Sequence, residues 1–180
     1  MVDEVHWTVV ATSLGPLVAG ASSAGVCWLS FGADPAMLRA QCAHALLVEG
    51  GPLITPLVGA LTAAIETPSP AMRDIPLDVS GTPFQRRVWE ALRAIPCGET
   101  RSYGDLAAAL GNPKASRAVG GANGANRIAV LIPCHRVVAA DGTLGGYAWG
   151  LEIKAELLRR EGAVRQSSQK IAASSQHKPG

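Results

Sequence analysis

The chain has 180 residues, of which 48% are hydrophobic, an ordinary share for a globular protein with a buried core. Its formal net charge is +2, and no apolar run approaches the roughly 20 residues that a membrane-spanning helix needs. Residues 1–4 begin acidic and lack the basic region and apolar run of a secretory signal. We therefore expect a cytoplasmic protein without a membrane segment.

Charge is distributed unevenly along the chain. Residues 1–80 carry 2 basic and 7 acidic side chains, a net charge of −5. Residues 81–165 carry 12 basic and 7 acidic side chains, a net charge of +5, and the last 15 residues add two lysines. A basic half of this kind is typical of proteins that bind a polyanion, although many basic surfaces are only solvated.

The first 80 residues predict a small αβ domain. Short β-prone runs at 7–10, 17–19 and 25–31, separated by Gly, Pro and Ser, indicate an antiparallel sheet. Helices are expected over 35–47 and 56–66, and a further strand over 75–79. We place the domain boundary at residues 80–81. This half carries no recognisable chemistry and is interpreted as a scaffold.

The second half predicts a mainly helical domain over residues 81–165, followed by a disordered tail over 166–180. Residues 82–85 and 102–105 both have the sequence of a capping box, which begins a helix. The second of these helices ends at Gly111, and Asn112 with Pro113 begins another that runs to about Ala122. Two short helices joined by a tight turn outline a helix-turn-helix, although an ordinary helical hairpin has the same outline.

The second helix of this pair has unusually small side chains. Its only charges are Lys114 and Arg117, and Gly120 with Gly121 weakens it. Small residues permit close approach of the backbone to a partner. This composition favours a DNA-binding helix over a structural one.

Residues 128–132 form a continuous apolar run that predicts a buried strand, and this run leads directly to Cys134 and His135. A glycine-rich loop over 141–150 and a final helix over 151–160 follow. A cysteine becomes a good nucleophile only as the thiolate, so it needs a base nearby. A core cysteine beside a satisfied histidine is the alternative, and the residues alone favour it.

Four cysteines are scattered singly, without a Cys-x-x-Cys pair. With the histidines of the first half they make no compact set of zinc ligands, so we predict free thiols and no metal. The residues concerned are Cys27, Cys42, Cys97, Cys134, His6 and His44.

The segment IPCHRVVAADGTLGGYAWG, residues 132–150, closely resembles the active-site signature of the O6-alkylguanine-DNA alkyltransferases. The resemblance continues upstream through GTPFQRRVWEALRAIPCGETRSYGDLAAALGNPKASRAVGGANGANRIAVL and downstream through KAELLRREG, and so covers residues 81–162 without a gap. The first half resembles the family's variable αβ domain only loosely. The zinc-cysteine domain of the bacterial adaptive-response protein has no counterpart here.

The resemblance implies a set of catalytic roles. Cys134 matches the alkyl acceptor, His135 the residue that draws its proton through a bound water, and Glu161 the carboxylate that orients this histidine. Asn126 matches an asparagine that braces the turn carrying the cysteine, and Tyr103 the donor of a proton to the departing guanine. Without the resemblance, Glu161 would be interpreted as a surface carboxylate and Asn126 as a turn residue.

The resemblance also implies a partner, which is double-stranded DNA bound through the minor groove, with the alkylated guanine flipped out of the stack. Arg117 matches the residue that fills the space left by the guanine, and Tyr103 the residue that crowds the target phosphate. Asn112 matches a phosphate contact, and Ser116 and Gly120 complete the predicted DNA-binding set.

Val137, Tyr147 and Ala148 match residues that line the guanine pocket. The implied reaction is an irreversible, single-turnover transfer by a monomer that needs neither metal nor cofactor. The preference among alkyl groups and activity on O4-alkylthymine are left open.

Three other functions are alternatives to alkyl transfer. A lesion-binding protein of the alkyltransferase-like kind lacks the acceptor cysteine, which is present here. A helix-turn-helix transcription factor needs several base-reading side chains on its recognition helix. A cysteine hydrolase would process many substrates per molecule, whereas the predicted alkyltransferase stops after one.

Overall fold

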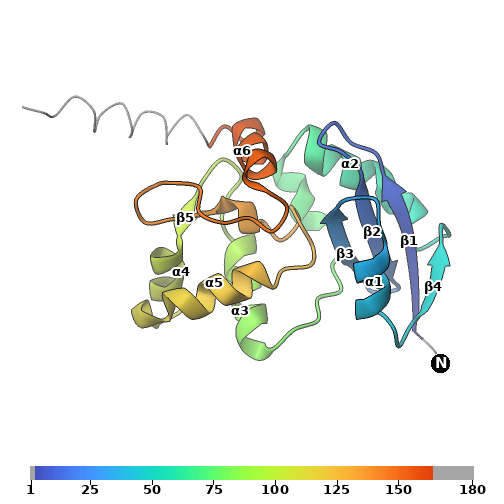
Figure 1. Ribbon diagram of the computed structural model, residues 1–180, viewed down its shortest axis with the longest axis horizontal. Helices are drawn as coiled ribbons and strands as arrows, with labels where there is room; N and C mark the ends of the chain where they lie inside the picture. Colours follow the sequence, from blue (N-terminus) through green and yellow to red (C-terminus); the bar gives the residue numbers. More distant parts are fainter. Residues whose placement is uncertain (1–2, 164–180) are drawn as a thin grey trace, which may run out of the picture.

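The computed structural model describes residues 3–163, so the tail predicted to be disordered lies outside the described residues. A four-stranded sheet with its helices forms one side of the molecule, and a group of helices forms the other (Figure 1). The mixed αβ fold class is confirmed. Among the described residues, no helix has the length and apolar character needed to cross a membrane.

The sheet contains the strands β1 (Glu4–Val10), β2 (Leu17–Ser22), β3 (Gly25–Phe31) and β4 (Leu46–Glu49) in the order β3-β2-β1-β4. β1, β2 and β3 pair antiparallel, as expected, whereas β4 joins the free edge of β1 in parallel. The remaining elements before residue 80 are α1 (Ala36–Gln41), η1 (Thr55–Leu57), α2 (Val58–Glu66) and η2 (Pro70–Asp74).

Two predictions in this half were wrong. The helix expected over 35–47 ends at Gln41, because residues 46–48 belong to strand β4, whose backbone pairs with β1. The strand expected over 75–79 forms only an isolated bridge between Leu77 and Val26. The helix expected over 56–66 is present, with a short 3-10 turn at its start.

The second half contains α3 (Pro83–Arg93), β5 (Arg101–Ser102), α4 (Tyr103–Ala109), η3 (Pro113–Ala115), α5 (Ser116–Gly124), η4 (Cys134–Arg136), β6 (Val137–Val138) and α6 (Leu151–Arg160). Both capping boxes are present. The Thr82 hydroxyl accepts from the Gln85 amide at 3.2 Å, and Ser102 accepts from Asp105 at 3.0 Å. α4, η3 and α5 form the helix-turn-helix outline.

One hydrophobic core runs through both halves. It includes Leu29 and Ile65 from the first half and Val88, Ile132 and Leu157 from the second. A smaller cluster lies between the sheet and α1. The domain boundary at residues 80–81 remains a prediction, and the core is continuous across it.

Candidate active site

The turn that precedes Cys134 is built around the side chain of Asn126, which is 5% exposed. Its amide nitrogen donates to Ile132 O at 2.9 Å and lies 3.2 Å from Cys134 Sγ, and its oxygen accepts from Ile128 N at 2.9 Å. These bonds replace those of a strand, and Val130 has a φ of 69°, which a β-branched residue rarely adopts. The predicted strand over 128–132 was therefore wrong.

Cys134 is the first residue of η4 and is 3% exposed. Burial raises the pKa of its thiol to about 11, against the opposing effects of the Asn126 amide and the Lys154 charge. At neutral pH the thiol is therefore protonated. A base has to remove its proton before the sulfur can act as a nucleophile.

A buried ion-pair network lies beside this thiol. His135 Nε2 lies 2.9 Å from Glu161 Oε1, and Arg136 donates to both oxygens of Glu161, at 3.0 and 2.8 Å. Arg136 also donates to Ile95 O at 2.7 Å. Although burial of Glu161 favours its protonated form, the hydrogen bonds from His135 and Arg136 lower its pKa to about 2. Glu161 is therefore an ionised carboxylate at neutral pH.

His135 itself is fully buried, and burial lowers its pKa below the ordinary 6.5 even though Glu161 acts in the opposite direction. The imidazole is therefore neutral at pH 7. Because Glu161 is ionised, Nε2 carries the proton and donates it to this carboxylate. The other nitrogen, Nδ1, is an acceptor, and it is buried without a hydrogen bond to any described residue. His135 is thus held in the tautomer of a general base.

Tyr103 lies at the start of α4, between α5 and the glycine-rich loop. A Cβ added at Gly120 would lie 3.8 Å from its ring, and one added at Gly145 would lie 3.7 Å from its hydroxyl. The pKa of Tyr103 is raised by burial and then by the negative charge of a Cys134 thiolate. Tyr103 is therefore close to the reactive sulfur and stays protonated.

The three residues predicted to line the pocket differ in exposure. Val137 is fully buried, whereas Ala148 is exposed. The hydroxyl of Tyr147 is buried without a hydrogen bond to a described residue, and burial, with the charges of Cys134 and Glu161, raises its pKa well above 10. The structure thus brings Tyr147 to the same site as Cys134.

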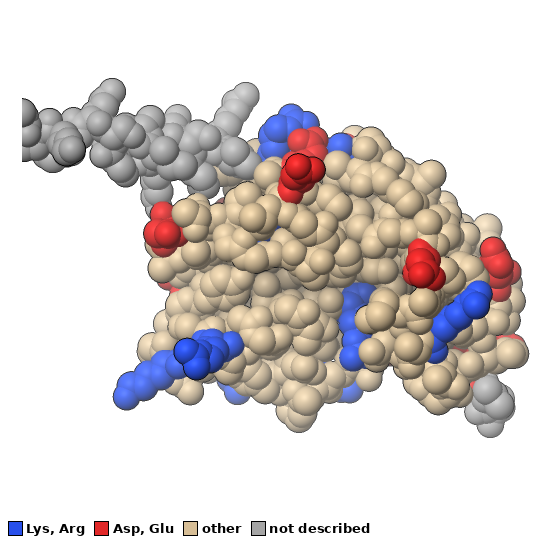
Figure 2. Space-filling model, in the orientation of Figure 1, with Lys and Arg blue, Asp and Glu red and all other residues tan. Residues whose placement is uncertain are grey.

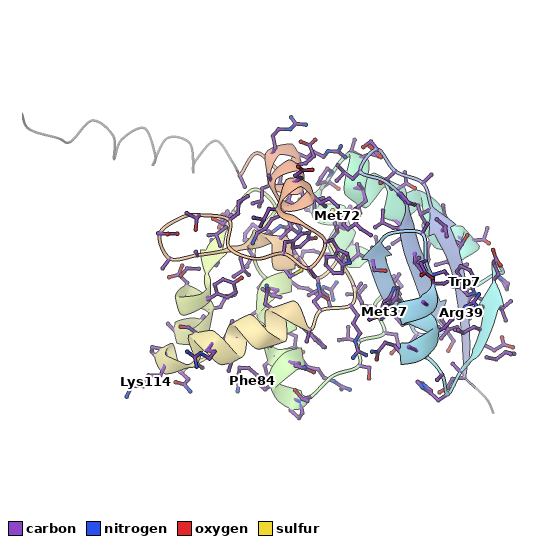
Figure 3. The ribbon with its side chains drawn as sticks, viewed as in Figure 1. Trp7, Met37, Arg39, Met72, Phe84 and Lys114 are labelled. Carbon is purple, nitrogen blue, oxygen red and sulfur yellow. The ribbon has the colours of Figure 1, made fainter. Side chains whose placement is uncertain are left out.

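The predicted DNA-binding residues lie at the outer face of the helix-turn-helix. Arg117 and Asn112 are exposed, and Ser116 is half-buried at the first position of α5. Asn112 caps η3 by accepting from Lys114 N at 3.2 Å. Lys and Arg side chains project from this end of the molecule, where Lys114 lies (Figures 2 and 3). This face is basic and close to Tyr103, but separate from the buried thiol.

Two comparisons with known proteins point to the same family. The family described as "6-O-methylguanine DNA methyltransferase, DNA binding domain" matches residues 83–163. The crystal structure of Mycobacterium tuberculosis OGT in complex with DNA is 37% identical in sequence and superposes with a TM-score of 0.76. The match covers 88% of this chain and 93% of that one. The chain belongs to the O6-methylguanine-DNA methyltransferase family.

The alignments with curated members of this family cover only about half of each of those proteins. The bifunctional transcriptional activator/DNA repair enzyme Ada of Escherichia coli is 43% identical over 161 residues, which is 87% of this chain and 45% of Ada. A methylated-DNA–protein-cysteine methyltransferase of Salmonella typhimurium is 65% identical over 82 residues, which is 46% of this chain and 48% of that protein. The chain spans about half the length of the curated relatives it matches.

Two residues of this family member's site were missed by sequence reasoning. Lys154 is fully buried, and its ammonium donates to Val137 O at 2.6 Å, to Gly146 O at 3.0 Å and to Leu144 O. Burial lowers its pKa to about 8. Helical spacing places it on the buried face of α6 with residues 157 and 158, so a lysine at a core position was the available signal. Apart from its position next to His135, nothing in the sequence indicated that Arg136 binds Glu161.

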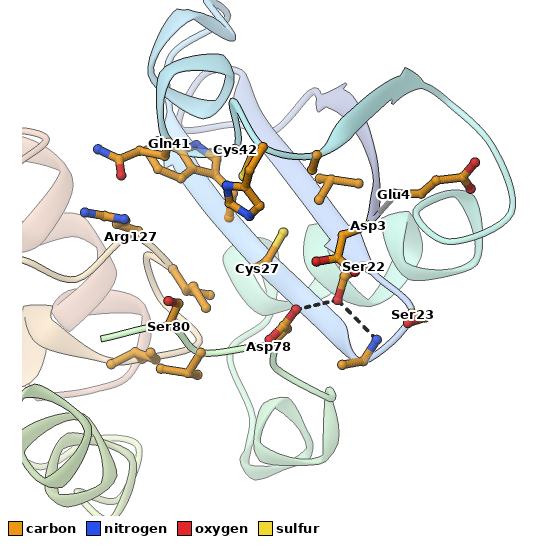
Figure 4. Close-up of a pocket in the computed structure, with 18 of the residues that line it drawn as sticks. Asp3, Glu4, Ser22, Ser23, Cys27, Gln41, Cys42, Asp78, Ser80 and Arg127 are labelled. Atoms are coloured by element: carbon orange, nitrogen blue, oxygen red, sulfur yellow. Dashed lines mark hydrogen bonds between the residues drawn. The ribbon is translucent and has the colours of Figure 1, made fainter. Parts of the chain in front are cut away.

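A cavity of 280 Å³ lies elsewhere, between the sheet and the turn that carries Asn126 (Figure 4). Cys27, Cys42 and Asp78 line it, and burial raises the pKa of Cys27 to about 12. Across residues 3–163, no three His, Cys, Asp or Glu side chains are grouped so that they could hold a metal ion. Cys134 does not line this cavity, which meets the candidate active site at Asn126 and Ile132.

Proposed function

We propose that this protein repairs DNA by moving an alkyl group from O6 of guanine to Cys134, once per molecule. The observation that carries this proposal is the pairing of a buried, protonated thiol with a buried, neutral imidazole whose Nε2 is fixed by Glu161 at 2.9 Å. Such a thiol is unreactive until its proton is removed in place, which is the arrangement that a single-use nucleophile needs.

In the proposed reaction, the Cys134 proton passes through a bound water to His135 Nδ1. Glu161, held by Arg136, stabilises the imidazolium that forms. The sulfur attacks the alkyl carbon in line, an S–C bond forms and the bond between that carbon and O6 breaks. Guanine leaves with the electron pair of that bond and takes a proton from Tyr103. The thioether product has no hydrolytic route back, and no metal or organic cofactor takes part.

The proposed substrate is double-stranded DNA, bound by a monomer through its minor groove. The groove is about 6 Å wide, and the small residues of α5, including Gly120, suit such close approach. Arg117 fills the space left by the flipped guanine, and Asn112 and Ser116 contact the backbone. The flipped base enters the pocket formed by Val137, Tyr147 and Ala148, because the O6 alkyl carbon cannot be attacked inside the stack.

The test is the intact mass of the protein after incubation with excess duplex DNA containing O6-methylguanine. The wild type should gain one methyl group and no more, peptide mapping should place it on Cys134, and Cys134→Ser should gain none. If the wild type binds the DNA and its mass never changes, the protein is a lesion sensor and the proposal is wrong. Repeated turnover would indicate a hydrolase.

A further inference from the structure

Three aromatic rings connect the N-terminal sheet to the glycine-rich loop. Phe31 ends β3, and its ring centroid lies 6.2 Å from that of Trp149, at an interplanar angle of 61°. Trp149 in turn lies 5.2 Å from Tyr147, at 70°. Both geometries are edge-to-face, the arrangement that aromatic pairs favour. The loop before α6 and the end of β3 are thus in contact, although more than 100 residues separate Phe31 from Trp149 in the sequence (Figure 1).

The loop has two kinds of attachment, and they act on different parts of it. Lys154 holds the part of the loop around residues 144–146, because its ammonium donates hydrogen bonds to the carbonyls of Leu144 and Gly146. The next part, residues 147–150, has two backbone hydrogen bonds, one within it from Gly150 N to Tyr147 O and one from Lys154 N of α6 to Gly150 O, both at 3.2 Å. The side chains of Tyr147 and Trp149 also pack against the main core, and the contact of Trp149 with Phe31 joins this part to the end of β3.

We infer that Phe31 is a positioning residue for the alkyl-transfer site. By holding Trp149 it fixes the part of the loop that places the Tyr147 ring beside Cys134. The inference rests on the proposed function, since that ring forms a wall of the proposed guanine pocket. It also assigns a role to the N-terminal half, whose sequence carries no recognisable chemistry of its own.

The first test compares Phe31→Ala with Phe31→Tyr, which keeps the ring. Met37→Ala is the matched control, because Met37 is 62% exposed on the same half of the molecule. Hydrogen exchange of the amides in residues 139–150 should accelerate in Phe31→Ala and not in the other two variants. Exchange in α4 and α5 should be unchanged in all three.

The second measurement is the single-turnover rate of methyl transfer at saturating DNA. Phe31→Ala should be about two- to tenfold slower, the range that the loss of one aromatic pair allows, with unchanged DNA affinity. Phe31→Tyr should restore the rate. A merely structural role would lower stability without this combination of a slower rate, normal affinity and rescue.

A double-mutant cycle closes the test. Since both side chains act through one contact, Phe31→Ala combined with Trp149→Ala should be no slower than the slower single variant. Additive losses, a wild-type loop exchange rate in Phe31→Ala, or faster exchange with an unchanged transfer rate would each overturn the inference. If the wild type transfers no methyl group, the proposed function fails, and the exchange and its coupling to Trp149→Ala still decide whether Phe31 holds the loop.

Discussion

The protonation of His135 should control the rate of transfer. Because burial lowers the pKa of His135 below its ordinary value, the rate at saturating DNA should fall on acidification only at a lower pH than an ordinary histidine would give, where the imidazole becomes protonated. Glu161→Gln removes the carboxylate that favours the protonated form, so this variant should be slower and its decline should shift to lower pH. A wild-type rate that rises on acidification would exclude His135 as the base.

Asn126 should contribute more to stability than an exposed asparagine cap does. Asn126→Ala leaves the amide of Ile128 buried without its partner, at a cost of about 1–3 kcal/mol, and removes one of the two donors to Ile132 O, which keeps the amide of Cys134. We expect the free energy of unfolding, measured in urea, to fall by at least about 2 kcal/mol. The control is Asn112→Ala, an exposed cap that should cost about 1 kcal/mol or less. Equal losses in the two variants would contradict this account of the turn.

The residues of the site were predictable from the sequence to different degrees. Cys134 and His135 were found because their chemistry is local and the surrounding segment is a long match to one family. Arg136 and Lys154 were not found, because the identity of a basic residue does not show whether its side chain is buried or exposed. Their burial depends on acceptors 25 and 10–17 residues away, namely Glu161 for Arg136 and the carbonyls of 137 and 144 for Lys154.

Among the helices, α5 combines low intrinsic stability with a proposed contact to DNA. Gly121 is exposed, and a Cβ there would meet nothing within 4 Å, so Gly121→Ala should stabilise the protein by about 0.5–1 kcal/mol. If α5 lies in the minor groove, the added methyl group should also weaken DNA binding. Thermal unfolding and a binding titration test the two effects together.

The control for this prediction is Gly59→Ala in α2, which is also exposed with free space around its Cβ. It should raise stability to a similar degree and leave DNA affinity unchanged. A Gly121→Ala variant that binds DNA as well as Gly59→Ala would argue against α5 as the helix that approaches the groove.

Elements that are specified by short-range interactions were predicted well. The starts of α3 and α4 follow from Thr82 with Gln85 and from Ser102 with Asp105, residues three positions apart. The turn over 128–132 was mistaken for a strand, because a side chain outside the apolar run, that of Asn126, supplies its hydrogen bonds. β4 was likewise assigned to a helix, since its partner β1 lies 42 residues earlier.

Across the whole molecule, Arg160 joins the last helix to the N-terminal half. It donates to Ile65 O at 2.9 Å and to Ser13 Oγ at 2.8 Å. Arg160→Ala should lower the free energy of unfolding by about 1–3 kcal/mol, because hydrogen bonds from a charged donor are lost. Arg159→Ala is the control, since its side chain is 66% exposed and pairs with Glu156.

Chemical denaturation distinguishes these two variants. Arg159→Ala should change the stability by less than about 0.5 kcal/mol. A small effect of Arg160→Ala, matching that of Arg159→Ala, would mean that the core alone joins the two halves. That core could not be predicted from either half separately. Its residues come from many helices, strands and loops of both halves, which only the complete fold brings together.

The burial of Cys134 also affects how long its thiol stays unmodified before the proposed transfer takes place. A protein consumed by its own reaction loses its whole function to any accidental modification of that one sulfur. At 3% exposure and a pKa of about 11, Cys134 offers oxidants and free alkylating reagents little thiolate to attack, whereas Cys27, Cys42 and Cys97 are all more accessible. Mild treatment with iodoacetamide should therefore label Cys42 and Cys97 before Cys134. The proposed methyl-transfer capacity of the sample would then persist after these accessible thiols have been alkylated.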